Sequence, residues 1–278
     1  MANERSQTRS ATRYLKVPGG RIGYDVRGEG PLALLLPGMG ELRSSYRHLA
    51  PKLVAAGYQV VTVDLRGHGD SDATFTAYGD TETASDLAAL LRKLGPPAVV
   101  IGNSMSAGSA VIVAADHPDL IDALVLIGPF VRNPVNSTGL QRLLFRIMLA
   151  RPWARAVWNT YLPKLYSGRK PTDFDDYRAG MLAAMKRPGY TKAFALTART
   201  DHAPAERALS AVRAPSLVVM GERDPDFDDP AAEATWIGNT LGGTVAMVAD
   251  AGHYPQSQQP EATAAAITEF LRNEAVDA

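Results

Sequence analysis

AVVIGNSMSAGSAVIVAADH, residues 98–117, places an apolar run, a serine and a helical pattern in direct succession. Residues 98–103 are a nearly unbroken apolar run, which is typical of a strand buried on both faces. Residues 105–117 follow at once with the apolar spacing of a helix. The segment therefore predicts a sharp strand-to-helix turn at Ser104.

The same alternation of strand and helix extends in both directions along the chain. The predicted strands are 12–18 and 21–27, an opening hairpin, then 33–36, 59–65, 98–103, 123–128, 216–221 and 244–249. The predicted helices are 43–57, 82–94, 105–117, 231–241 and 259–273. Alternation of this kind predicts an α/β fold, with a mostly parallel eight-stranded sheet and helices on both of its faces.

One region breaks this rhythm. Residues 131–209 contain no convincing strand and much helical pattern. We interpret them as an inserted helical lid on a core domain formed by 12–130 and 210–278. Residues 1–11 are expected to be a disordered tail, since they are polar and follow no period.

Composition excludes several classes of protein. Hydrophobic residues make up 46% of the chain, enough for a large core, and the net charge of +0 gives no reason to expect nucleic acid as a partner. The absence of cysteine excludes disulfides and thiolate chemistry. No apolar run is long enough for a membrane span, and the polar first ten residues do not resemble a secretory signal. We expect a cytoplasmic protein; its oligomeric state cannot be read from the sequence.

Ser104 has the surroundings of a catalytic nucleophile. A serine on a strained strand-to-helix turn needs small neighbours, and Gly102, Ser106 and Ala107 meet that need. The helix N-terminus adds free N–H groups beside a developing oxyanion, including that of Met105. Ser106 replaces the last glycine of the usual G-x-S-x-G pattern. The alternative is that Ser104 only caps the helix.

Several segments together resemble the α/β-hydrolase family over residues 12–275. They are LLLPGMG (34–40), DLRGHGDSD (64–72), GNSMSAG (102–108), GERDPDF (221–227) and DAGHYPQSQQPE (250–261). The resemblance implies a serine hydrolase fold with a Ser-His-Asp triad and no cofactor.

A base and an acid are expected at the carboxyl ends of later strands. His253 follows the last predicted strand, and the family places its catalytic histidine in such a loop. Asp224 follows the strand 216–221, and the family pattern G-x-x-D-P favours it over Asp226 and its neighbours. The chain order Ser, Asp, His is that of α/β-hydrolases. The aspartates also resemble the start of a calcium loop, but the glycine and closing glutamate of that loop are missing, so no metal is expected.

The resemblance implies that the second oxyanion donor is the backbone N–H of Met39. Many relatives have His-Gly where this chain has Pro37-Gly38, which matters little to a backbone donor. Gly38 and Gly40, with Asp64 at the end of the next strand, also hint at a dinucleotide site, but Arg43 occupies the place of the third glycine.

The predicted lid supplies candidate pocket residues. These are Phe145, Trp153, Trp158, Tyr161 and His202, of which His202 has an alternative role in shaping its loop. Residues 142–158 carry arginines near one helical face and apolar side chains on others, which we interpret as a solvated basic face over an apolar lining. The sharper hypothesis is that the apolar side covers an apolar acyl or ring-bearing substrate.

The leading hypothesis is therefore hydrolysis of a small, largely apolar carboxylic ester or lactone through an acyl-serine intermediate. The resemblance also allows haloperoxidase-like, carbon–carbon hydrolase and acyltransferase activities. From another class, a slow-turnover ligand-sensing receptor would carry the same triad.

Overall fold

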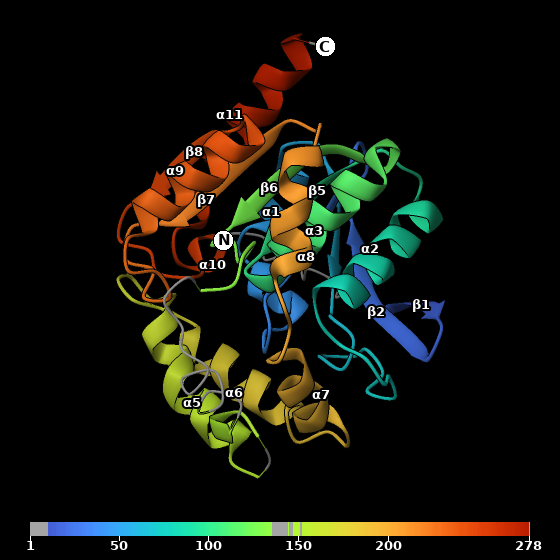
Figure 1. Cartoon of the computed structure of the whole chain (residues 1–278), viewed down its shortest axis with the longest axis vertical. Helices are drawn as coiled ribbons and strands as arrows, with labels where there is room; N and C mark the ends of the chain where they lie inside the picture. The colour runs from blue at the N-terminus through green and yellow to red at the C-terminus, as the bar shows by residue number, and fades with distance from the viewer. Residues whose placement is uncertain (1–10, 135–143, 145–146, 151, 278) are drawn as a thin grey trace, which may run out of the picture.

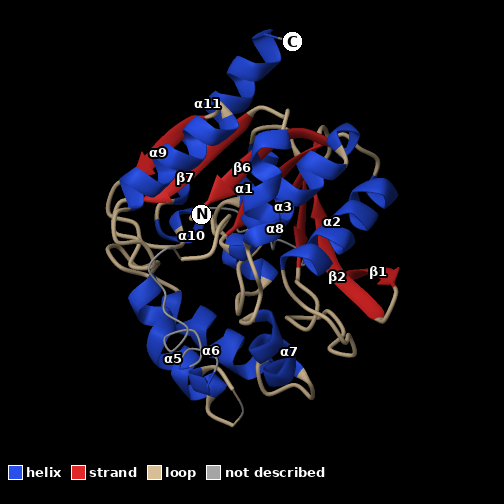
Figure 2. Ribbon diagram, viewed as in Figure 1, coloured by secondary structure: helices blue, strands red, loops and turns tan. Residues whose placement is uncertain are grey.

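The fold is an eight-stranded sheet covered by helices (Figures 1 and 2). The computed structural model describes residues 11–134, 144, 147–150 and 152–277 of the chain. Most of the tail expected at 1–11, and parts of the expected lid that include Phe145, lie outside the described residues. Within the described residues, no helix combines the length and apolarity needed to cross a bilayer.

The sheet is parallel except at one edge. Its strands are β1 (Arg13–Val17), β2 (Gly20–Arg27), β3 (Leu32–Leu36), β4 (Gln59–Val63), β5 (Ala98–Asn103), β6 (Ile121–Ile127), β7 (Ser216–Gly221) and β8 (Thr244–Val248). Their spatial order is β1-β2-β4-β3-β5-β6-β7-β8, and β2 pairs antiparallel with both β1 and β4. The predicted fold class is confirmed.

Helices cover both faces of this sheet. The α-helices are α1 (Ala50–Ala55), α2 (Asp80–Leu94), α3 (Met105–Asp116), α5 (Ala154–Leu165), α6 (Phe174–Ala184), α7 (Tyr190–Thr197), α8 (Ala203–Ala208), α9 (Pro230–Leu241), α10 (Pro255–Gln258) and α11 (Pro260–Asp277). The described residues also form the 3₁₀ helices η1 (Arg43–Tyr46), η2 (Pro118–Leu120) and η3 (Leu209–Ala211). Helices α2, α3, α8 and α9 share a core with one face, and α1 and α11 share a core with the other.

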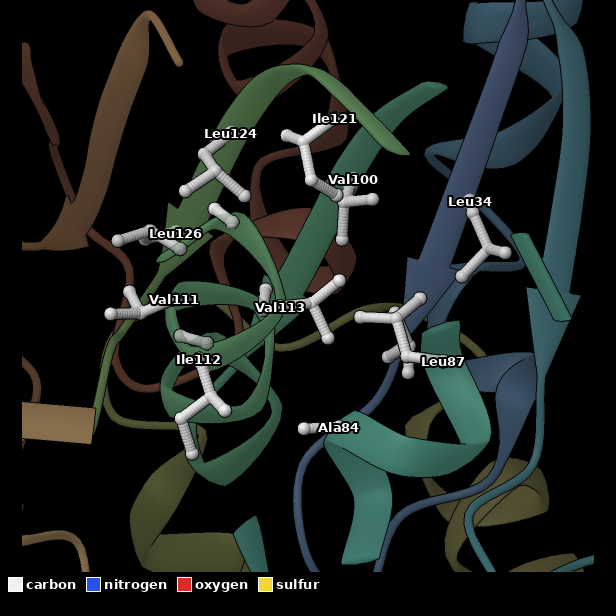
Figure 3. Packing of buried hydrophobic residues seen from close by; sticks show 14 of the residues in the cluster. Leu34, Ala84, Leu87, Val100, Val111, Ile112, Val113, Ile121, Leu124 and Leu126 are labelled. Atoms are coloured by element: carbon white, nitrogen blue, oxygen red, sulfur yellow. The ribbon is translucent and has the colours of Figure 1, made fainter. Parts of the chain in front are cut away.

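Strand β3 shows why the sheet is buried on both sides. Successive side chains of a strand point to opposite faces, so Leu34 and Leu36 join the α2 and α3 side, whereas Leu35 packs with Tyr46 and the α1 side. Figure 3 shows Leu34 and Leu87 within the first of these cores. Each fully buried side chain of this size stabilises the fold by roughly 1.5–3 kcal/mol.

Helices α5, α6 and α7 form a separate layer with a core of its own. In Figure 1 they lie together in the lower part of the view, apart from the helices that flank the sheet. Trp158, Met181 and Phe194 are buried in this core, which also includes Tyr254 from the loop after β8. Helix α8, the last of the segment, packs instead against α3. The α5–α7 layer therefore meets the sheet domain at the loops that follow the strands.

Candidate active site

The loops that carry the candidate site flank the point where strand order reverses. From β3 the chain crosses to β4 on one side, then returns to β5 on the other. Ligands of open α/β sheets bind beyond the carboxyl ends of strands at such a point. The loop 37–42 follows β3, and Ser104 follows β5. Sheet topology thus places the predicted nucleophile and the predicted oxyanion loop side by side.

Ser104 stands in a strained turn between β5 and α3. Its backbone has φ 57° and ψ −126°, a left-handed conformation that non-glycine residues rarely adopt. Its N–H donates to the carbonyl of Ile127 at 2.9 Å, and its own carbonyl accepts from Phe130 N–H at 3.2 Å. These bonds to β6 and to the loop after it hold the turn in place despite the strain.

The small neighbours of Ser104 are required by close packing. A Cβ on Gly102 would lie 2.6 Å from the carbonyl oxygen of Ser106, and one on Gly38 would lie 2.8 Å from Cβ of Ser104. Ser106 is fully buried, and its hydroxyl donates to the carbonyl of Pro37 at 2.6 Å. The serine in place of the usual glycine therefore fits, and it ties the nucleophile turn to the oxyanion loop.

His253 and Asp224 form a buried hydrogen-bonded pair. Nδ1 of His253 lies 2.7 Å from Oδ2 of Asp224, and the two side chains are 2% and 0% exposed. Because Nδ1 is committed to Asp224, Nε2 is the ring nitrogen that remains available for other contacts. Nδ2 of Asn103, the residue before Ser104, donates to the His253 carbonyl at 3.2 Å, which fixes the histidine loop relative to the serine turn.

A second carboxylate lies near the same imidazole. Oδ2 of Asp226 is 3.8 Å from Nδ1 of His253, and the Tyr161 hydroxyl of α5 donates to Asp226 Oδ1. Burial alone lowers the pKa of His253, but the charge and hydrogen bond of Asp224 and the charges of Asp226 and Glu41 raise it to about 9. The two aspartates therefore strongly favour positive charge on this ring.

These groups surround a cavity of about 400 Å³. It is lined by Met39, Ser104, Met105, Phe130, Asn133, Pro134, Trp158, Tyr161, Leu165, Ala198, Arg199, Thr200, His202, Asp226, His253 and Tyr254. Of the predicted pocket residues, Trp158, Tyr161 and His202 line it. Trp153 does not: it is 48% exposed, and its indole N–H donates to the carbonyl of Ile147. Apolar side chains supply most of the lining, with polar groups at a few points.

The two expected oxyanion donors, the backbone N–H groups of Met39 and Met105, have no hydrogen-bond partner among the described residues, and both residues line the cavity. His68 holds the loop of Met39. Its Nδ1–H donates to the Arg66 carbonyl at 3.0 Å, and its Nε2 accepts from Gly40 N–H at 3.1 Å. Burial lowers the pKa of His68 to about 4, so the ring stays neutral and can act as this acceptor.

Glu41 ties the oxyanion loop to the α5–α7 layer. It is fully buried and accepts a hydrogen bond from the Tyr177 hydroxyl of α6. Burial raises the pKa of Glu41 to about 7, although the Tyr177 hydrogen bond and nearby positive charges lower it. A movement of α6 would therefore displace the loop that carries Met39.

The alternatives for a metal or a dinucleotide can be compared with the geometry. Ligand atoms of Asp224, Asp226 and His253 lie within 4.8 Å of one another, a spacing that the hydrogen bonds among these residues and Tyr161 account for. Asp64 is buried and accepts hydrogen bonds from Arg43 and from the Asp70 N–H. It is therefore not free to bind a ribose hydroxyl.

Sequence reasoning missed several residues of this site. Phe130 contacts both histidines of the cavity: its ring centroid lies 5.7 Å from that of His253 and 5.8 Å from that of His202. Asp80 accepts a hydrogen bond from His202. No motif marks either residue, and only the position of Phe130 just after a strand could have drawn attention to it.

Comparison with known proteins decides the family. A sequence model described as the alpha/beta hydrolase family matches residues 33–266. The chain belongs to the α/β-hydrolase family. It is 30% identical over 273 residues to the 2-(acetamidomethylene)succinate hydrolase of Mesorhizobium japonicum, covering 92% of this chain and 94% of that protein.

Two further matches describe the spread of this α/β-hydrolase's relatives. It is 27% identical over 248 residues to human monoglyceride lipase, covering 81% of this chain and 76% of the lipase. The crystal structure of a bromoperoxidase from Bacillus anthracis superposes with a TM-score of 0.82 at 20% identity, covering 94% of this chain and 100% of that one. The superposition shows the fold alone; the family and the sequence similarities support hydrolase chemistry and leave its substrate open.

Proposed function

We propose that this α/β-hydrolase is a serine hydrolase that cleaves a small carboxylic ester or lactone through an acyl-serine intermediate. Ser104 is the nucleophile, His253 the base and Asp224 the acid that orients the base. The backbone N–H groups of Met39 and Met105 bind the oxyanion.

The observation that carries this proposal is the buried His253–Asp224 hydrogen bond of 2.7 Å beside a cavity that Ser104 also lines. A buried carboxylate on Nδ1 fixes the tautomer whose Nε2 can take a proton. A serine hydroxyl is a weak nucleophile until such a base is present. The strained turn at Ser104 is the second support, because strain of about 1–3 kcal/mol is kept where a side chain must be presented in one direction.

The reaction follows from these roles. The Ser104 hydroxyl oxygen attacks the ester carbonyl while its proton passes to Nε2 of His253. The oxyanion of the tetrahedral intermediate accepts hydrogen bonds from the Met39 and Met105 N–H groups. The intermediate collapses, and the leaving alcohol takes the proton from His253. Water, deprotonated by the same imidazole, then attacks the acyl-serine. The second tetrahedral intermediate collapses, the Ser104 oxygen takes back the proton from His253, and the acid is released.

The cavity supports a small substrate with an apolar body. Its volume of about 400 Å³ is at the lower end for small-molecule sites. Trp158 and Leu165 of α5 form part of its lining, and the backbone N–H of His253 donates to the backbone carbonyl of Leu165 at 2.8 Å. We infer that the α5–α7 layer serves as the lid of this site and sets the size of the acyl group.

Labelling with a fluorophosphonate tests the nucleophile directly. The expected result is one labelled peptide that contains Ser104, with labelling and aryl-ester hydrolysis both lost in Ser104→Ala. Ser216→Ala is the matched control, because Ser216 is a buried serine outside the cavity lining that bonds only the Ala214 carbonyl, so this variant should keep the label on Ser104. Full activity in Ser104→Ala would contradict the proposal.

Assays of the wild-type chain distinguish ester hydrolysis from the alternative activities. Esters of increasing acyl length report the expected apolar preference, and a lack of gain with length counts against it. Peroxide-dependent bromination, transfer of the acyl group to added alcohol, and cleavage of a carbon–carbon bond each identify a different product. A single turnover with no further product would indicate a ligand-sensing receptor.

A further inference from the structure

The cavity contains a second histidine–aspartate pair. Nδ1 of His202, in the loop before α8, lies 2.8 Å from Oδ2 of Asp80, the first residue of α2. The Asp80 side chain is 0% exposed and that of His202 is 12% exposed. The distance and the buried carboxylate resemble those of the His253–Asp224 pair, yet no serine of the proposed mechanism belongs to this one.

Asp80 is held so that it can only orient His202. Its Oδ1 accepts from the Thr200 hydroxyl at 3.1 Å, and that hydroxyl in turn accepts from the Asp80 N–H at 3.0 Å. Burial raises the pKa of Asp80, and its hydrogen bond with His202 is the largest effect in the opposite direction. The carboxylate is thus occupied on both oxygens, and His202 Nδ1 is committed to it.

The other nitrogen of the His202 ring is the available one. Nε2 makes no hydrogen bond to any residue in the part of the chain that the structure describes, and His202 lines the cavity. One face of the ring stacks on Phe130, with 5.8 Å between centroids and 26° between planes. The ring is therefore fixed in position with one polar atom uncommitted.

The charges around the cavity differ between its two histidines. Near His253 the cavity wall carries the carboxylate of Asp226. The lining also includes Arg199, three residues before His202 in the chain, whose guanidinium has no ion pair or hydrogen bond within the described ranges. Asp201 also interacts electrostatically with His202, but it does not line the cavity, and its Oδ1 accepts hydrogen bonds from Asn133 and the Ala203 N–H. An anionic group would be repelled by Asp226 and attracted by Arg199.

We propose that His202, oriented by Asp80 and assisted by Arg199, binds a carboxylate carried by the substrate away from the bond that is cleaved. A doubly protonated imidazole donates through both nitrogens; in that form the His202 ring bridges the Asp80 carboxylate and that of the substrate. The substrate class becomes an ester or lactone with an apolar body and one anionic end. This inference rests on the proposed serine hydrolase function.

The test compares two aryl esters of nearly equal shape. 4-Nitrophenyl hemiglutarate ends in a carboxylate, whereas 4-nitrophenyl 5-methylhexanoate ends in a neutral branched group of similar size. For the wild-type chain we expect a lower KM for the anionic ester, and an advantage that shrinks at high salt. A higher KM for the anionic ester would overturn the proposal.

Variants locate the carboxylate site. His202→Phe keeps the stacking on Phe130 but removes both nitrogens. We expect it to reduce the ratio of kcat/KM for the anionic ester to that for the neutral ester by about tenfold or more, mainly through KM. His117→Phe, which changes a histidine outside the cavity, should leave the ratio unchanged. An equal loss for both esters in His202→Phe would mean a structural role only.

Two further measurements keep the outcome decisive. Arg199→Gln changes an exposed residue and should lower the same ratio even if His202→Phe does not fold. An unchanged ratio would count against the proposed carboxylate site. If neither ester is hydrolysed and Ser104 is not labelled, the proposed function fails. Calorimetric binding of monomethyl glutarate to the wild-type chain, compared with methyl pentanoate, then decides the carboxylate site separately.

Discussion

The two histidine–aspartate pairs of this cavity share nearly the same bond but differ in surroundings. The Nδ1 to Oδ2 distances are 2.7 Å for His253–Asp224 and 2.8 Å for His202–Asp80, and both rings lie against Phe130. His253 comes from a strand-end loop of the sheet, whereas His202 comes from the end of the helical segment. Each ring has a second carboxylate within electrostatic reach, Asp226 for His253 and Asp201 for His202, but only Asp226 lines the cavity.

On the two proposals above, a histidine–aspartate bond alone does not define a catalytic base. Strand topology brings His253 to the cavity that contains Ser104 and its strained turn, and the carboxylates of Asp224, Asp226 and Glu41 raise the pKa of the ring. His202 has an oriented ring without a proposed nucleophile. The same local unit can therefore serve as a base in one place and as a binding group in another, depending on what its free nitrogen meets.

The largest expected contrast is between His253→Gln and His202→Gln. Glutamine cannot accept and return the serine proton, so the change at residue 253 should lower kcat for a neutral aryl ester by about 10⁴-fold or more. The change at residue 202 should lower it by no more than about tenfold. Steady-state kinetics with 4-nitrophenyl acetate measures both.

A folding control is needed, and one outcome would contradict the assigned roles. Melting temperatures within a few degrees of wild type establish that both variants are folded. If His202→Gln is the more severe change in kcat, the roles of the two pairs are reversed.

Among the carboxylates, Asp224→Asn should have the larger effect and Asp226→Asn the smaller. The amide at residue 224 can present an N–H to Nδ1 and favour the wrong tautomer, which lowers kcat by about 10³-fold. Asp226 lies 3.8 Å away and is bonded to Tyr161, so its loss should cost less than about tenfold at pH 9. A larger loss at Asp226 would assign the orienting role to that residue instead.

The parts of this site that were predictable lie in continuous motifs. The turn at Ser104 combines a buried strand, small neighbours and a helix start within a few residues, and His253 follows the last strand directly. Asp80 and His202 are 122 positions apart in the chain, and no spacing rule brings them together. The role of Asn103 depends on a carbonyl of residue 253, and the exposure of Trp153 depends on how α5 packs. Such contacts are set by tertiary packing and leave no local pattern.

The pH profile sharpens the comparison further. The proposed mechanism needs neutral His253, so kcat/KM should rise with pH, reach half of its maximum near the pKa of about 9 and level off above it. Asp226 favours the charged ring, and therefore Asp226→Asn should lower the pKa of His253 and move the rise to lower pH. The ratio of kcat/KM at pH 7 to that at pH 10 should then increase a few-fold. Asp176→Asn on α6, outside the cavity lining, is the control, and an unmoved profile in Asp226→Asn would remove Asp226 from the electrostatics of the base.

The smallest expected effects concern the asparagine that holds each histidine's backbone. Nδ2 of Asn103 donates to the carbonyls of His253 and Ile127 at 3.2 and 3.0 Å, and Asn103 is fully buried. Oδ1 of Asn133 accepts from the His202 N–H at 3.2 Å at a site that is only partly buried. Asn103→Ala leaves two carbonyls without this donor and should lower the free energy of unfolding by about 2 kcal/mol, whereas Asn133→Ala should lower it by less than about 1 kcal/mol. Urea unfolding measures both.

Because Asn103 also fixes the distance between the serine turn and the base, its variant should lose kcat several-fold, while Asn133→Ala should alter only KM for the anionic ester. Equal effects of the two variants on kcat would mean that the two histidines are not separated into a base and a binding group.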